Sequence, residues 1–300
     1  MAEEARLESY RNRRAWLAAR RTGVGGSDAA AIVGVDPWKS ELQVYAEKLG
    51  GMAEEAGEEA TWGLLFQRPV ARHYAAQTRR KLARLPAHHL HRSVSTPWLI
   101  GSVDGLIESV PDWPGQGVLE VKCTGFYRAR QLQEEFPLYW QVQVQHYLAV
   151  LGLEWASIAV LSEGRKFLWL DMERNQRFIA VLLEREAEFW RQVKSKSPPD
   201  PDASESARDA LSYLYPQETV GTAVDLPVEA VSWDENRTRG SVLVAEGEAL
   251  KNESEAKIKA AMGEAEIGML PTGVKYSWRS QRRKGYAVKE SIFRVLRRRE

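Results

Sequence analysis

The stretch Leu119-Glu120-Val121-Lys122-Cys123, together with Gly101-Ser102-Val103-Asp104-Gly105 before it, decides the fold of this chain. The apolar residues around Glu120 and Lys122 favour a β-strand. In a strand, side chains alternate between the two faces, so Glu120 and Lys122 lie side by side on one face. The residues between and beside them point to the other face and can pack into a core. The sequence therefore predicts a carboxylate and an ammonium group held together on a rigid element.

The acidic residue of the earlier stretch can extend this pair. If the strand next to Asp104 pairs with the strand that carries Glu120, the two carboxylates meet. Two carboxylates can hold Mg²⁺ and leave coordination positions for water and a phosphate group. Lys122 can then orient an attacking water or help to stabilise negative charge. This combination is what a metal-dependent phosphodiesterase requires.

Both motifs also have simpler interpretations. Asp104-Gly105 is a common hairpin signal, and a Glu-x-Lys pair on a solvated strand is a common exposed ion pair. Short motifs of this kind often occur without function. Spacing alone therefore leaves the catalytic and the structural interpretations open.

The composition indicates a soluble protein without a general attraction to nucleic acid. The chain has 300 residues, enough for one large domain or two smaller ones, and a net charge of +1. Any DNA-binding surface must therefore be local. The single cysteine, Cys123, excludes an internal disulfide and indicates a reducing compartment. No apolar run is long enough to span a membrane and the N-terminus is too charged for a signal peptide, so we expect a cytoplasmic protein and no membrane partner.

The N-terminal region contains a possible phosphate site. Residues 4–21 predict a basic amphipathic helix, and a short Ala-rich helix is expected to begin at Ser27 after a Gly-rich turn. A serine N-cap followed by Asp28 is an ordinary helix start. The same geometry exposes backbone N–H groups at the positive end of the helix, which suits a phosphate. Arg20 and Arg21 lie immediately upstream and could grip phosphate oxygens, although helix capping alone is the more common explanation.

Five motifs follow one another along the chain. They are Arg21-Thr22-Gly23-Val24-Gly25-Gly26-Ser27-Asp28-Ala29-Ala30, Trp62-Gly63, Ser102-Val103-Asp104-Gly105, Glu120-Val121-Lys122 and Gln143-Val144-Gln145-His146-Tyr147-Leu148. Each motif is weak alone, but the five in this order are specific. The chain resembles the YqaJ family, the phage-type recombination exonucleases related to lambda exonuclease within the PD-(D/E)XK nuclease superfamily. The resemblance covers roughly residues 15 to 195.

The resemblance implies a catalytic centre. In it, Asp104, Glu120 and the Val121 carbonyl hold Mg²⁺, for which Mn²⁺ is expected to substitute. Lys122 assists the attacking water. The catalytic residues implied are therefore Asp104, Glu120 and Lys122.

The resemblance also implies DNA contacts. It carries a pocket for the 5′-phosphate of a DNA end onto Arg21 and Ser27, with Ser102 as a further contact. It also implies that Gln143 and Tyr147, which lie one helical turn apart, border the active site and bind DNA, with Gln143 as the contact to a backbone phosphate. On periodicity alone, Tyr147 is equally a core residue and Gln143 an exposed helix former.

The sequence departs from the family pattern at Gln67. Family members commonly have a glutamate four residues after the glycine of the Trp62-Gly63 pair, where it helps to hold metal. A glutamine can ligate through its carbonyl oxygen, but it brings no charge to offset a dication. A tightly bound second metal is therefore less expected than the first. A neighbouring acid, an altered register or a glutamate-to-glutamine substitution would each explain the difference.

The order of expected elements indicates an α/β fold with a mixed central sheet flanked by helices, the PD-(D/E)XK restriction-endonuclease-like core. Besides the Glu-x-Lys strand, strands are expected near 98–100 and over 156–161 and 166–171. Helices are expected over 41–50, 62–78, 139–151 and 174–195, the third ended by Gly152, and a short helix or loop over 126–134.

The Pro-rich stretch Ser197-Pro198-Pro199-Asp200-Pro201-Asp202 reads as a linker. We expect a nuclease domain over residues 1–200 and a C-terminal extension over 201–300. The extension is predicted to contain two exposed helices within 225–263 and a hairpin formed by 274–279 and 285–294. Its last 29 residues hold ten Lys and Arg against two Glu, interleaved with aromatic residues. This pattern fits nucleic acid, an acidic partner or a solubilising terminus equally.

The histidines at 88, 89 and 91 raise the question of a zinc site. A zinc site needs more ligands at suitable spacing, and Cys123 lies in the strand row that faces away from Glu120. We therefore interpret the three as surface histidines.

The function expected from the resemblance is a Mg²⁺-dependent 5′-to-3′ exonuclease on linear double-stranded DNA. It would release mononucleotides from a 5′-phosphorylated end and leave a 3′ single strand for recombination by strand annealing. Lambda-type relatives form trimeric rings and work with a phage single-strand annealing protein, so both partners are implied here. The alternatives are a structure-specific DNA endonuclease of the same superfamily and a non-catalytic DNA-end-binding module.

Overall fold

The computed structural model describes residues 5–50, 58–125, 132, 136–283, 285, 290 and 293–298; for 58–60 it describes the backbone alone. The chain forms two compact units. The first extends to Pro216 and the second covers Gln217–Val295.

The first unit contains the expected mixture of helices and strands. Its helices are α1 (Arg13–Arg20), α2 (Gly26–Ile32), α3 (Glu41–Lys48), α4 (Glu58–Thr78), α6 (Leu138–Leu151), α7 (Gln176–Ser195) and α8 (Glu205–Leu214). Its strands are β1 (Ala5–Ser9), β2 (Leu82–Ala83), β3 (His89–Ser93), β4 (Ile100–Gly101), β5 (Gly105–Ile107), β6 (Gly117–Thr124), β7 (Trp155–Ser162) and β8 (Lys166–Glu173).

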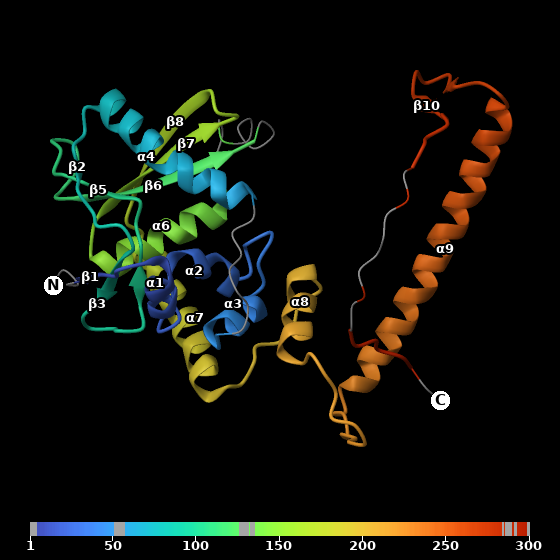
Figure 1. Ribbon diagram of the computed structural model, residues 1–300, viewed down its shortest axis with the longest axis horizontal. Coiled ribbons are helices and arrows are strands. Elements are labelled where there is room, and N and C mark those ends of the chain that lie inside the picture. The colour runs from blue at the N-terminus through green and yellow to red at the C-terminus, as the bar shows by residue number, and fades with distance from the viewer. Residues whose placement is uncertain are drawn as a thin grey trace. The chain divides into compact units, whose positions relative to one another are not determined.

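A five-stranded sheet in the order β2-β5-β6-β7-β8 forms the centre of this unit (Figure 1). The β6–β7 pair is parallel and the other pairs are antiparallel. Helix α4 packs on one face of the sheet and α6 on the other. The predicted α/β fold with a mixed central sheet flanked by helices is confirmed.

The two faces of β6 separate as the alternation of its side chains predicts. Val118 packs in the cluster on the α6 face, with Val144 and Leu148. Leu119 packs on the opposite face with Val70 and Tyr74 of α4. Glu120 therefore points to the side of the sheet that α6 covers.

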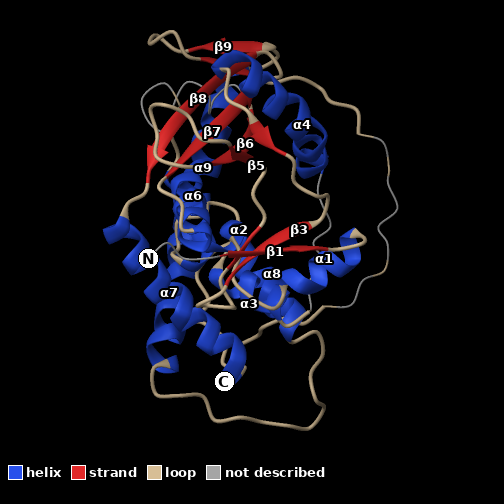
Figure 2. Ribbon diagram, turned by 90° about the vertical axis from the view of Figure 1, so that its left-hand side faces the viewer, coloured by secondary structure: helices blue, strands red, loops and turns tan. Residues whose placement is uncertain are grey.

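A smaller antiparallel sheet, β1-β3-β4, lies beside α1 and α2 in Figure 2. Helix α2 packs against α6, and α8 packs on α3. Ser206 of α8 donates a hydrogen bond to Gln43 of α3 and accepts one, 2.9 Å long, from the Ser40 backbone N–H. The chain beyond the Pro-rich stretch thus still contributes a helix to the first unit, and the division at residue 200 stays a prediction.

The prediction of one helix over 4–21 is wrong. Residues Ala5–Ser9 form β1, which pairs with β3, and only Arg13–Arg20 are helical. The Asn12 side chain caps this helix by accepting from the Ala15 N–H at 2.9 Å. Tertiary strand pairing overrides the helical spacing of the apolar residues.

The histidines lie in and next to β3, and the surface interpretation is wrong for His91. This side chain is only 4% exposed, and burial lowers its pKa to about 4. Among the residues that the structure describes, no group of three or more His, Cys, Asp or Glu side chains is placed to hold a metal ion.

Helices α3, α4, α6 and α7 and strands β7 and β8 lie where the sequence predicts them, within a few residues at their ends. Gly152 ends α6 in the left-handed conformation, with φ of 63°. Most of the segment 126–134 lies outside the described residues. None of the described helices is long and apolar enough to cross a membrane.

The second unit consists of α9 (Ala230–Met262) and a hairpin of β9 (Ile267–Met269) and β10 (Lys275–Ser277). The prediction of two helices within 225–263 is wrong, since α9 runs through 33 residues without a break. Gly240 and Gly247 lower its helix propensity but do not end it. Of the predicted hairpin, the segment 274–279 contains β10, which pairs with the earlier strand β9. Most of the predicted partner segment 285–294 lies outside the described residues.

Candidate active site

The site forms where β5 and β6 pair. Their antiparallel register places Gly105 opposite Leu119, so Asp104 lies next to the middle of β6. The Val121 backbone N–H donates to Asp104 Oδ2 at 2.7 Å. The pairing that the sequence required for a carboxylate pair is therefore present.

Glu120 and Lys122 share one face of β6 as predicted. Lys122 Nζ donates to Glu120 Oε1 at 2.7 Å and to Gln143 Oε1 at 2.7 Å. Gln143 Nε2 donates to the same Glu120 oxygen at 2.8 Å and lies 3.1 Å from the Tyr147 hydroxyl. Two residues of α6 thus join the pair on β6 in one polar network.

The two carboxylates lie close enough to repel each other. Burial and the neighbouring Glu120 charge raise the pKa of Asp104 to about 8. Glu120 is 4% exposed, and its Oε2 atom is buried without a hydrogen-bond partner. A buried carboxylate oxygen without a partner is costly. A divalent cation between Asp104 and Glu120 would remove both penalties, so the residues fit such an ion.

Gln67 of α4 lies at this site. Its amide Nε2 donates to Asp104 Oδ1. The position expected for a third acidic ligand is therefore adjacent to the carboxylate pair, and the alternative of an altered register is not needed. The glutamine replaces a negative charge with a hydrogen-bond donor, so the site has two carboxylates instead of three.

Tyr147 connects this centre to the start of α2. Its ring is buried and packs against Gly26 and Gly101, where an added Cβ would lie 2.4 Å and 2.9 Å from ring carbons. Any side chain at either glycine would displace the ring. Burial, with the nearby Glu120 and Asp104 charges, raises the pKa of the Tyr147 hydroxyl well above its usual range.

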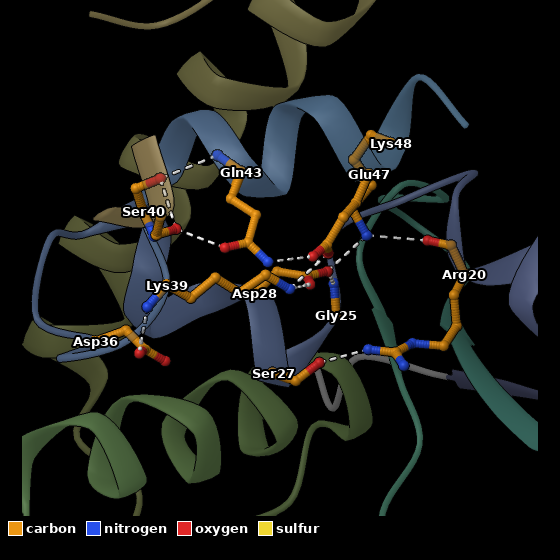
Figure 3. A network of polar contacts seen from close by, with 11 residues as sticks. Arg20, Gly25, Ser27, Asp28, Asp36, Lys39, Ser40, Gln43, Glu47 and Lys48 are labelled. Atoms are coloured by element: carbon orange, nitrogen blue, oxygen red, sulfur yellow. Dashed lines mark hydrogen bonds and ion pairs between the residues drawn. The ribbon is translucent and has the colours of Figure 1, made fainter. Parts of the chain in front are cut away.

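The structure brings Ser27 together with Arg20 rather than with Arg21. Arg20 Nη2 donates to Ser27 Oγ at 2.5 Å, and its guanidinium lies 4.9 Å from the centre of the Trp16 ring. Figure 3 shows Arg20 facing Ser27 at the start of α2. Arg21 is exposed. Ser102 is held by other contacts, since its hydroxyl donates to the His89 carbonyl at 2.7 Å.

A buried ion pair next to Ser27 was not predicted from the sequence. Asp28 Oδ2 accepts from Lys48 Nζ at 2.6 Å and from the Gly25 backbone N–H at 2.9 Å (Figure 3). Burial opposes the charge on Asp28, but Lys48 and Lys39 hold its pKa well below the usual range. Gly25, not Ser27, is therefore the N-cap, and Asp28 is more than an ordinary helix-start residue. The lysine lies 20 residues away, so the local sequence gave no signal for it.

His146 forms a second buried pair behind the site. Its Nδ1 lies 2.7 Å from Glu186 Oε1 and its Nε2 lies 2.8 Å from the Ile100 carbonyl oxygen. The Ile100 carbonyl can only accept, so Nε2 carries a proton, and Nδ1 shares a proton with the Glu186 carboxyl group. Burial opposes the charge, but Glu186 raises the pKa of His146 above its usual value. The ring ties α6 to α7 and to β4, the strand that leads to Asp104.

Comparison with known proteins identifies the family of this chain. The family model of the YqaJ-like viral recombinase domain matches residues 15–154. Over 275 residues the chain is 32% identical to the uncharacterized protein YqaJ of Bacillus subtilis. The matched region covers 90% of this chain and 84% of that protein. The chain belongs to the YqaJ family.

Solved structures extend this likeness to the fold. The crystal structure of the alkaline exonuclease LHK-Exo from Laribacter hongkongensis matches with a TM-score of 0.51 and 18% identity. The match covers 61% of this chain and 94% of that one. The structure of LHK-Exo in complex with dAMP matches equally. The predicted family and fold are confirmed.

Two substitutions at the site should shift the thermal stability of the metal-free protein in opposite directions. Folding raises the pKa of Asp104 from its usual 3.8 to about 8. The free energy of unfolding therefore falls as the pH rises between these two values, because Asp104 ionises more readily in the unfolded chain. Asp104→Asn removes the charge, still accepts from Val121, and needs only a flip of the Gln67 amide. Gln67→Glu adds a third carboxylate. In EDTA at pH 8, we expect a higher Tm for the first variant and a lower Tm for the second, with each 1 kcal/mol shifting Tm by roughly 2–4 °C.

Added Mg²⁺ supplies the control. It should raise the Tm of Gln67→Glu more than that of the parent protein and leave Asp104→Asn almost unchanged. An Asp104→Asn protein that is less stable than the parent in EDTA would contradict the repulsion between Asp104 and Glu120.

Proposed function

We propose that this protein is a Mg²⁺-dependent exonuclease that degrades one strand of linear duplex DNA from a 5′-phosphorylated end. The observation that carries the proposal is the Asp104–Glu120–Lys122 arrangement, with one Glu120 oxygen buried and unpaired. Family membership and the fold shared with an alkaline exonuclease support the same reaction class. The 3′ single strand left behind would then serve recombination by strand annealing.

Asp104 and Glu120 would hold the metal ion, with the Val121 carbonyl as a third ligand. A bound Mg²⁺ supplies positive charge that polarises the phosphate group and favours deprotonation of an attacking water. Mn²⁺ has similar ligand preferences and should substitute. With Gln67 in place of an acid, we propose one tightly held ion.

Lys122 is the residue placed to act on the reacting groups. Its ammonium group donates to Glu120 and Gln143, which fixes its position on the α6 side of β6. An ammonium held in this way can orient a water and stabilise charge as it develops on a phosphate oxygen. The Gln143 amide bridges Lys122 and Glu120 and keeps both groups in place. We propose that Gln143 also contacts the DNA backbone, as the family resemblance implies.

The terminal 5′-phosphate would bind at the start of α2. Ser27 is exposed there, and the Arg20 guanidinium lies against it. An arginine fork matches phosphate oxygens geometrically, and the backbone N–H groups of a helix start favour an anion. We therefore assign the main phosphate contact to Arg20 and Ser27. Ser102, whose hydroxyl donates to the His89 carbonyl, and Arg21 are kept as outer contacts.

The partners proposed for this reaction follow from the family. They are linear duplex DNA ends and a phage single-strand annealing protein, and the proposed assembly is a trimeric ring. A cytoplasmic location, in a bacterial or phage-infected cell, follows from the same reasoning.

Replacing Lys122 tests the proposed chemistry. Lys122→Ala should fold normally and still bind duplex DNA in EDTA, while cleavage in Mg²⁺ falls by a factor of about 10²–10³, the usual effect of losing one charge-stabilising donor. Lys166→Ala, which changes an exposed lysine of β8, is the matched control and should keep full activity. Cleavage by Lys122→Ala at the parent rate would remove Lys122 from the mechanism.

The two neighbouring arginines provide a matched test of the phosphate pocket. Arg20→Ala should reduce the preference for a 5′-phosphate over a 5′-hydroxyl end by about tenfold or more, because hydrogen bonds to charged groups contribute about 1.5–3 kcal/mol. Arg21→Ala should change this preference much less. The ratio of initial cleavage rates on the two kinds of end measures the preference. The opposite result, a loss only in Arg21→Ala, would restore Arg21 as the main contact.

A further inference from the structure

We propose that the β9–β10 hairpin and the basic residues that follow it bind single-stranded nucleic acid. This surface consists of Lys275, Tyr276, Trp278, Arg279 and the Arg282–Arg283 pair, and we call it the hairpin surface. None of these residues belongs to the candidate active site. The proposal concerns binding alone and does not depend on the proposed cleavage reaction.

The charge of the chain is concentrated at its C-terminal end. Residues 272–300 hold ten Lys and Arg against two Glu, a net charge of +8, while the whole chain carries +1. The first 271 residues therefore carry a net −7. A polyanion approaching this protein is attracted to the C-terminal segment and repelled on average by the rest.

The hairpin gives part of this segment a fixed shape. Tyr276 lies opposite Gly268 in the register, and the Trp278 backbone N–H donates to the Glu266 carbonyl at 2.9 Å. Gly268 packs closely on the end of α9, where an added Cβ would lie 2.8 Å from Met262 Cγ. Lys275 and Tyr276 thus lie on a defined strand, and the hairpin packs against the end of α9.

Tyr276 in β10 and Trp278, the residue just after this strand ends, are both accessible. Tyr276 is 41% exposed and Trp278 is 50% exposed, and their positions two residues apart place them on the same side of the strand. Side chains with this spacing stand roughly 6.7 Å apart. That distance is about twice the 3.4 Å separation of stacked bases, so a single base can insert between the rings.

Basic residues flank the two rings along the chain. Lys275, Arg282 and Arg283 are exposed. Arg279 Nε lies 2.5 Å from Glu266 Oε1, but both side chains are more than half exposed. An exposed ion pair contributes little to stability, so a phosphate group can replace Glu266 as the partner of Arg279.

Exposed aromatic rings together with basic residues favour a single-stranded nucleic acid over a duplex or an acidic protein. Bases in a duplex are already stacked and paired, so they cannot stack on Tyr276 and Trp278 without unpairing. An acidic protein would use the positive charges but would gain nothing specific from the rings. Unpaired bases present flat faces to the rings and phosphates to the arginines, which is the usual basis of sequence-independent binding.

The experiment measures binding of a fluorescent thymidine oligonucleotide with a 5′-hydroxyl end to the full chain in EDTA, where no cleavage occurs. An oligonucleotide of roughly 30 nucleotides exceeds the ~4–16-nucleotide footprint of known single-strand-binding domains. The double variant Tyr276→Ala/Trp278→Ala should weaken binding about fivefold or more, since each stacked base contributes about 1–3 kcal/mol. Trp233→Ala, which removes an exposed tryptophan of α9, is the control and should bind as the parent does.

Salt dependence tests the arginines separately. Arg282→Ala/Arg283→Ala should reduce the slope of log Kobs against log salt by about 1.4, because each phosphate contact to a single strand contributes about 0.7. Arg237→Ala/Arg239→Ala, in exposed positions on α9, should leave the slope unchanged. Unchanged affinity in the aromatic variant, or polyglutamate binding as tightly as the oligonucleotide and depending on the same arginines, would overturn the proposal and indicate a surface for an acidic partner.

Discussion

The pairing of β5 with β6 is the constraint on which the candidate site depends. It fixes Asp104 on the Val121 backbone N–H and so brings a second carboxylate to Glu120, at the cost of a pKa raised to about 8. Such an arrangement is unfavourable without a cation. The fold tolerates it because β6 is held between α4 and α6 by apolar packing on both faces.

Polar contacts from both covering helices converge on the same pair. Gln67 reaches Asp104 from α4, and Gln143 reaches Glu120 and Lys122 from α6. Tyr147 extends the α6 network to Gly26, at the start of the helix that presents Ser27. The proposed chemistry and the proposed phosphate pocket are therefore supported by one helix, and a change in α6 should affect both.

The sequence predicted the parts of the site that depend on local spacing. The shared face of Glu120 and Lys122 follows from strand alternation, and the Gln143–Tyr147 contact follows from helical spacing. The sequence did not predict contacts between distant segments, such as Asp28 with Lys48 or His146 with Glu186, because each needs a particular packing of helices. Whether Arg20 or Arg21 contacts Ser27 depends on the orientation of the last turn of α1. The predicted helix over 4–21 was wrong because strand pairing with β3 overrides local propensity. Gln67 departs from the family pattern in the sequence, but only the structure shows its contact with Asp104.

The most direct test of the proposed function uses linear duplex DNA with a 5′-phosphate on one end and a 5′-hydroxyl on the other. The two strands carry different labels, and a closed circular duplex is incubated in parallel with Mg²⁺ or EDTA. We expect mononucleotides to be released from the phosphorylated strand, no release in EDTA, and an intact circle. Cleavage of the circle would contradict the exonuclease and indicate an endonuclease, while DNA binding without any product in Mg²⁺ would indicate a non-catalytic end-binding protein.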